Sequence, residues 1–210
     1  MDTNSPHVLT DPSDRPILLT AANAVHYVDL LWPVGLATHM AANAKSPLYG
    51  SPVKYASTAG WTLGREKSGV VYFDKFPIVR LTPEQERRVV RIAKVAYRPC
   101  CDNSAFFQDC NHGSALLGLL QLGASQGLSE HKLYREALAF NGFWFPDNYV
   151  QTALFFEVVR KTRWADVDPK LVLGYDYSAL GPWQQNVAAR VKAIRGLIPS
   201  APSGGAGCGV

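Results

Sequence analysis

The apolar residues of the chain recur with the spacing of helices along most of its length. Between residues 17 and 44 they return about every 3.6 positions, which predicts a first helix that Pro33 ends or kinks. A second helix is predicted over residues 83–97, because Thr82 can cap it and Gln85 can complete a capping box. Much of the N-terminal half is therefore expected to be helical.

The run SALLGLLQLGASQG, residues 114–127, contains no charged residue. A surface helix would carry charges on its outer face, so this run predicts a buried central helix. Further helices are predicted over residues 128–140, 147–163 and 182–195. Asn141-Gly142 is expected to end the first of these, because both residues favour turns.

One segment, GWTLGREKSGVVYFDKFPIVRL, departs from the helical pattern. Residues 61–64 and 70–73 flank a turn at Ser68-Gly69, which predicts a β-hairpin near residues 60–74. A two-stranded hairpin is marginally stable alone, so it must pack on the helices. The predicted fold is mainly α, a single-domain helical bundle of about seven helices with one small β-hairpin.

The length of 210 residues and the hydrophobic content of 47% suit one domain with a sizeable core. This domain is expected to span residues 17–198. Residues 1–16 contain several prolines and predict a flexible N-terminal arm. Residues 199–210 form a tail rich in Gly, Ser and Pro.

The net charge of +4 comes from Lys and Arg residues that are spread along the chain. Their densest groups, at residues 87–94 and 160–163, are expected to be solvated faces of helices. A nucleic-acid site needs basic residues on one face with aromatic residues or a known motif, so no nucleic-acid partner is expected. No run of about 20 apolar residues is present, so no transmembrane segment is expected.

The opening MDTNSPHVLTDPSDRP is polar and contains no apolar signal segment. Two interpretations follow: a cytoplasmic protein with a native Met1, or an exported protein in which Met1 replaces a signal. The Pro-, Ser- and Asp-rich composition is typical of a tether behind a cleaved signal or lipid anchor. It favours an exported protein of the periplasm or cell envelope, with a possible envelope tether in the precursor.

The segment RPCCDNSAFFQDCNHGSALLGLL holds three of the four cysteines. The candidate metal ligands are Cys100, Cys101, Cys110, His112 and Cys208. Three thiolates and one imidazole complete a tetrahedral zinc set, and thiolates also suit copper(I) and iron–sulfur clusters. The paired spacing of structural zinc ligands is absent, so the metal stays open. We expect a transition-metal or metal-cluster protein for metal handling, or for electron transfer with a redox partner protein.

The start of the buried helix decides whether Cys110 and His112 can act together. If Asn111 or Ser114 caps the helix, residues 110–112 precede it and both side chains can turn toward one point. If Asp109 caps it, the two residues are helical and point about 200° apart. Because Asn, Asp and Ser are all good caps, the sequence leaves this open.

Disulfide bonds are the first alternative. Four cysteines allow three connectivities, and Cys101–Cys110 with Cys100–Cys208 would close a short loop and fix the tail. The protein would then be a disulfide-stabilised helical binding module with an aromatic pocket. Asn141, Trp144 and Tyr149 would line such a pocket, although buried packing at a helix corner is the commoner role of such residues.

A thiol enzyme is the second alternative, with Cys110 at a helix start as nucleophile and His112 or a distant histidine as base. Whether the protein is an enzyme stays open. Haem binding through His26, His39 or Met40 is not favoured, because no C-x-x-C-H attachment motif is present.

The run RPCC…DCNHG, the Leu/Gly-rich helix after it and the motif N-x-x-W-F-P resemble a little-characterised group of bacterial proteins. The similarity covers roughly residues 58–157 and brings no established activity with it. It implies export, and it implies that the cysteine segment is the functional centre.

Overall fold

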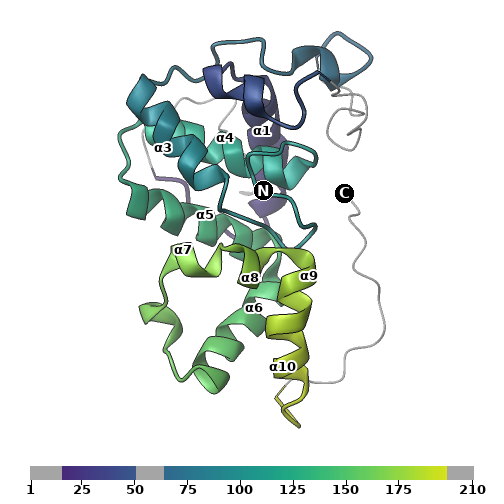
Figure 1. Ribbon diagram of the computed structural model, residues 1–210, viewed down its shortest axis with the longest axis vertical. Helices are drawn as coiled ribbons and strands as arrows, with labels where there is room; N and C mark the ends of the chain where they lie inside the picture. Colours follow the sequence, from purple (N-terminus) through teal and green to yellow (C-terminus); the bar gives the residue numbers. More distant parts are fainter. Residues whose placement is uncertain (1–15, 51–63, 198–210) are drawn as a thin grey trace, which may run out of the picture.

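The computed structural model describes residues 16–50 and 64–197 (Figure 1). The predicted arm, except Pro16, and the predicted tail lie outside these residues, as does Cys208. The helices are α1 (Ala24–Ala37), α3 (Pro83–Ala93), α4 (Asn111–Ser125), α5 (Glu130–Trp144), α6 (Pro146–Leu154), α7 (Pro169–Val172), α8 (Tyr175–Ser178), α9 (Leu180–Trp183) and α10 (Ala189–Lys192).

A π-helical turn, Phe155–Val159, continues α6, and a second, Gln184–Ala188, joins α9 to α10. The described residues therefore form eight continuous helices in one compact domain, against about seven in the prediction. The mainly α, single-domain fold is confirmed.

The predicted β-hairpin is wrong. Its second strand is replaced by a short 3₁₀-helix, Gly69–Tyr72, which Ser68 caps by accepting the backbone N–H of Val70. The Tyr72 hydroxyl accepts hydrogen bonds from the backbone N–H groups of Arg65 and Glu66, both at 3.0 Å. These bonds close residues 65–72 into a compact turn. Residues 61–63 lie outside the described residues, within which no strand is assigned.

The backbone that follows pairs with the end of α1 instead of with a second strand. Phe76 donates its N–H to the Ala37 carbonyl at 2.9 Å and accepts the N–H of His39 at 2.8 Å. The Asp74 carboxylate accepts the Met40 N–H at 3.0 Å. Because the last carbonyls of a helix lack partners within it, the end of α1 draws this segment away from a hairpin.

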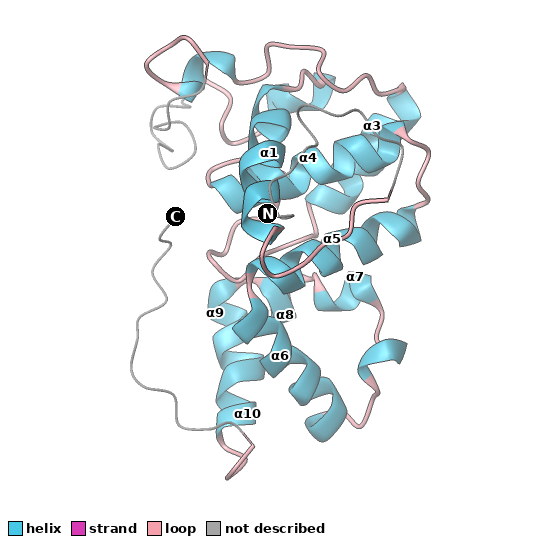
Figure 2. Cartoon of the chain, turned by 180° about the vertical axis from the view of Figure 1, so that it is seen from behind, coloured by secondary structure: helices cyan, strands magenta, loops and turns pink. Residues whose placement is uncertain are grey.

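The buried central helix is confirmed as α4, which packs across α1 and also contacts α3 and α5 (Figures 1 and 2). Where α1 and α4 cross, the two helix backbones are in direct contact at glycine residues. A Cβ on Gly35 would lie 1.8 Å from the Ser114 carbonyl oxygen, and one on Gly118 would lie 2.4 Å from that of Leu31. Pro33 lies within α1 and does not end it, because the helix continues to Ala37.

Helix α5 runs past Asn141-Gly142, where the sequence predicted its end. The fully buried Asn141 side chain donates to the Tyr97 carbonyl oxygen at 2.9 Å and to the Tyr149 hydroxyl at 3.0 Å. These tertiary bonds hold Asn141 in the helix and outweigh its preference for a turn. The chain turns only at Phe145, before Pro146 begins α6.

Among the described residues, no helix is long and apolar enough to cross a membrane.

The Gly118→Ala substitution should destabilise the protein, because the new methyl group would collide with the α1 backbone. We expect the free energy of unfolding to fall by about 1–3 kcal/mol in chemical denaturation. Gly142→Ala is the matched control, since Gly142 is helical and a Cβ there would meet no atom within 4 Å. It should leave stability unchanged or raise it by about 0.5–1 kcal/mol. Equal effects of the two substitutions would contradict the close crossing of α1 and α4.

Candidate metal centre

Cys110 is itself the N-cap of α4, with the extended dihedral angles φ −142° and ψ 162°. Its sulfur accepts the backbone N–H of Gly113 at 3.4 Å. The sequence analysis considered Asp109, Asn111 and Ser114 as caps of this helix, and none of them is the N-cap. Cys110 therefore stands just outside the helix, at its positive end, while His112 lies in the first helical turn.

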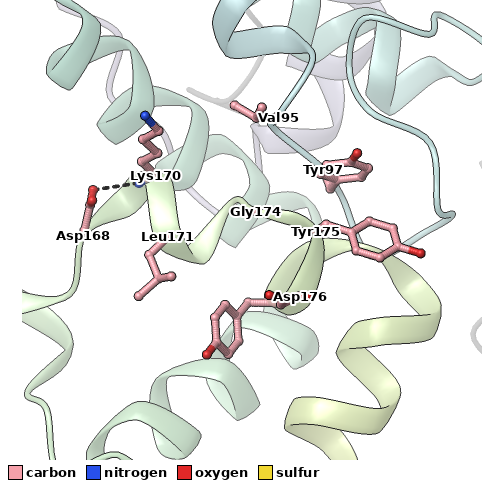
Figure 3. A pocket seen from close by; sticks show the side chains of 9 residues that line it. Val95, Tyr97, Asp168, Lys170, Leu171, Gly174, Tyr175 and Asp176 are labelled. Carbon is pink, nitrogen blue, oxygen red and sulfur yellow. Dashed lines mark hydrogen bonds between the residues drawn. The ribbon is translucent and has the colours of Figure 1, made fainter.

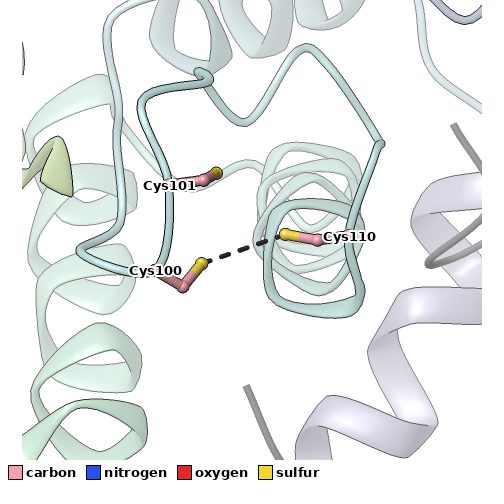
Figure 4. Close-up of side chains that lie close together, drawn as sticks. All are labelled: Cys100, Cys101 and Cys110. Atoms are coloured by element: carbon pink, nitrogen blue, oxygen red, sulfur yellow. Dashed lines mark hydrogen bonds between the residues drawn. The ribbon is translucent and has the colours of Figure 1, made fainter. Parts of the chain in front are cut away.

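The sulfur atoms of Cys100, Cys101 and Cys110 all lie within 4.8 Å of one another. The sulfurs of Cys100 and Cys110 point toward each other and are 4.0 Å apart (Figure 4). Sulfurs bound at about 2.3 Å to one metal ion lie about 3.8 Å apart in a tetrahedral site and about 4.0 Å apart in a trigonal one. The three cysteines, named the triad below, are thus close enough to bind a single metal ion.

Backbone hydrogen bonds fold the cysteine loop back onto its surroundings. Ala105 donates its N–H to the Ala96 carbonyl at 2.9 Å, close to the end of α3. On the other side, the Cys101 carbonyl accepts the Leu180 N–H at 3.1 Å, and the Asp102 carboxylate accepts the next N–H of α9 at 2.8 Å. The loop is therefore tied both to α3 and to α9, and its adjacent cysteines face the start of α4.

Arg98 is the residue that the sequence analysis missed. Its side chain is fully buried, and one guanidinium nitrogen donates both to Asp109 at 2.9 Å and to the Cys110 sulfur at 3.0 Å. Another nitrogen donates to the Asn103 carbonyl oxygen. Gly113 leaves room for this group, because a Cβ there would lie 2.2 Å from the guanidinium. A glycine in the first turn of a helix was the one sequence signal of this close approach.

The three cysteines of the triad differ in their pKa: that of Cys110 is lowered, and those of Cys100 and Cys101 are raised. Hydrogen bonds from Cys100 and Cys101, assisted by Arg98, hold the pKa of Cys110 well below its ordinary value, although burial opposes this. Hydrogen bonds to the other two cysteines, together with burial, raise the pKa of Cys100. The pKa of Cys101 is also raised, since the bond to Cys110 and burial outweigh the lowering effect of Cys100. Cys110 is therefore expected to be the first of the three cysteines to lose its proton.

His112 turns toward aromatic rings. Its ring centroid lies 4.6 Å from that of Phe145 and 5.9 Å from that of Trp144. Burial lowers the pKa of His112, so the imidazole is neutral near pH 7. The described hydrogen bonds of the Cys110 sulfur go to Arg98, Gly113, Cys100 and Cys101, so His112 is not placed as its general base. Metal binding by His112 and by Cys208 stays a prediction.

Cys100, Cys101 and Cys110 are free cysteines. A disulfide needs a sulfur–sulfur distance of about 2.05 Å, well below the 4.0 Å between Cys100 and Cys110. Because Cys101 and Cys110 are both free, the predicted Cys101–Cys110 disulfide is not formed, and Cys208 of the predicted Cys100–Cys208 bond lies outside the described residues.

Asn141 and Tyr149 belong to a buried polar network at a helix corner. The Tyr149 hydroxyl bonds to Ser178 at 2.7 Å, and burial raises the pKa of Tyr149 to about 12. A pocket of about 480 Å³ lies elsewhere, beside Val95 and Tyr97, on the stretch of chain that leads into the cysteine loop (Figure 3). It is lined by Val95, Tyr97, Asp168, Lys170, Leu171, Gly174, Tyr175, Asp176 and Tyr177.

Comparisons with known proteins leave the site to be interpreted from its own geometry. No protein-family model, curated protein or solved structure matches the chain. The chemistry available is that of three sulfur ligands at a helix N-terminus, with one buried guanidinium beside them.

In the reduced, metal-free protein, one thiolate should form at a lower pH than an ordinary cysteine requires. The ultraviolet absorbance of thiolates, followed against pH, measures this step directly. Cys110→Ser should remove the step, and Arg98→Lys should move it to higher pH by weakening the hydrogen bond to sulfur. Cys101→Ser is the control and should retain an early step. An early step that survives in Cys110→Ser would assign the thiolate to another cysteine.

Proposed function

We propose that this protein binds a transition-metal ion or small metal cluster through the triad, for metal handling or electron transfer. The observation that carries the proposal is the convergence of three cysteine sulfurs within 4.8 Å of one another. Two come from an irregular loop and one from the start of α4, so tertiary structure is needed to bring them together.

The arrangement of the sulfurs supports metal binding over a purely structural role. Each of the three cysteines is partly exposed, so an ion can reach them. Thiolates are the ligands of zinc, copper(I) and iron–sulfur clusters, and all three metals stay open in this proposal. Metal binding would displace the thiol protons that now link the sulfurs.

Hydrogen bonds from the surrounding residues hold the three cysteines in place, as they commonly do for the ligands of metal sites. Arg98 fixes Cys110, and the hydrogen bonds of Cys101 and Asp102 to α9 fix the other side of the loop. Groups behind the ligands commonly tune metal affinity by orienting them. We further propose that the protein is exported and exchanges metal or electrons with a partner protein there.

Protein purified without a histidine tag under anaerobic, reducing conditions should bind about one equivalent of a thiophilic metal per triad. Metal analysis and the thiolate-to-metal absorption band measure this. Cys100→Ser, Cys101→Ser and Cys110→Ser should each reduce binding strongly, because each removes a ligand. Ser104→Ala in the same loop is a control that removes no sulfur. Less than about a tenth of an equivalent of zinc, copper or iron in the parent protein would contradict the proposal.

A further inference from the structure

The side chains near the triad that have ligand atoms for a four-ligand shell, Asp109 and His112, are engaged elsewhere. The Asp109 carboxylate accepts hydrogen bonds from Arg98 at 2.9 Å and from Asn103 at 2.6 Å. The His112 ring lies against Phe145. Among His, Cys, Asp and Glu side chains of residues 16–50 and 64–197, the cluster with metal-ligand spacing here contains the three cysteines alone.

Arg98 also restricts where an ion can sit. Its guanidinium is 3.0 Å from the Cys110 sulfur and is fixed by burial and by Asp109. A cation is repelled by this group and is therefore expected on the side of Cys110 that faces Cys100 and Cys101.

We infer that the triad is a three-coordinate thiolate site for copper(I), with Arg98 as its positioning residue; this inference rests on the proposed function. The 4.0 Å separation of the Cys100 and Cys110 sulfurs is a spacing at which both can bind one ion, and the described cluster offers three sulfur ligands and no fourth side chain. Copper(I) is soft and accepts three thiolates as a complete shell. Zinc prefers four ligands and would need a water molecule or a further side chain here.

The coordination number of bound copper tests the inference directly. The full chain, reduced and metal-free, is loaded anaerobically with one equivalent of copper(I), and X-ray absorption spectroscopy counts the neighbours of the metal. We expect three sulfur neighbours and no nitrogen in the parent protein. His112→Gln and Cys208→Ala should give the same spectrum and the same copper(I) affinity against a competing chelator.

Arg98→Lys tests the positioning role, because lysine keeps the charge but not the fixed fork of donors. Its copper(I) dissociation constant should rise about 10- to 100-fold, the usual range for a group behind a ligand. Arg91→Lys is the matched control, since Arg91 pairs with Glu130 on the surface and should leave the constant unchanged. An unchanged constant in a folded Arg98→Lys variant would overturn the role of Arg98.

The possible failures are distinguishable. A fourth sulfur that disappears in Cys208→Ala, or a nitrogen that disappears in His112→Gln, would overturn the three-coordinate site while the proposed function stands. Copper binding that is unaffected by Cys100→Ser, Cys101→Ser and Cys110→Ser would overturn both. If Arg98→Lys fails to fold, the ligand count in the other two variants still decides the coordination number.

Discussion

The burial of Arg98 is the constraint on which the site depends. An uncompensated charge in the protein interior is strongly destabilising, so the structure must supply partners for the guanidinium. Asp109, the Asn103 carbonyl oxygen and the Cys110 sulfur are those partners, and all belong to the loop between α3 and α4. Compensation of one buried charge therefore closes the loop and sets Cys110 at the start of α4.

Helix α4 can serve this loop because its own position is fixed. The close crossing at Gly35 and Gly118 holds it against α1 with no side chain between the backbones. The Ser114 hydroxyl, one turn into α4, donates to the Trp32 carbonyl oxygen at 3.1 Å. A helix held so firmly presents its N-terminus at a fixed place, and the thiolate of Cys110 benefits from the dipole there.

Local signals predicted the elements well where they act within a few residues. Thr82 and Gln85 form the expected capping box of α3, and the charge-free run became the buried helix α4. The predictions failed where a distant partner decided the outcome. Phe76 pairs with the end of α1 instead of extending a hairpin, and Asn141 stays helical because Tyr97 and Tyr149 accept its hydrogen bonds.

The sequence by itself determined the mainly helical fold and singled out Cys100, Cys101 and Cys110. The spacing of apolar residues and the clustering of a rare residue type can both be read from residues that are close together in the chain. Only the tertiary structure decided that Cys110 is the helix cap, that His112 turns to aromatic rings and that Arg98 lies beside the sulfurs. These outcomes depend on burial and on contacts between segments that hydrophobic spacing does not encode. A buried arginine and a surface arginine look alike in a sequence until their partners are in place.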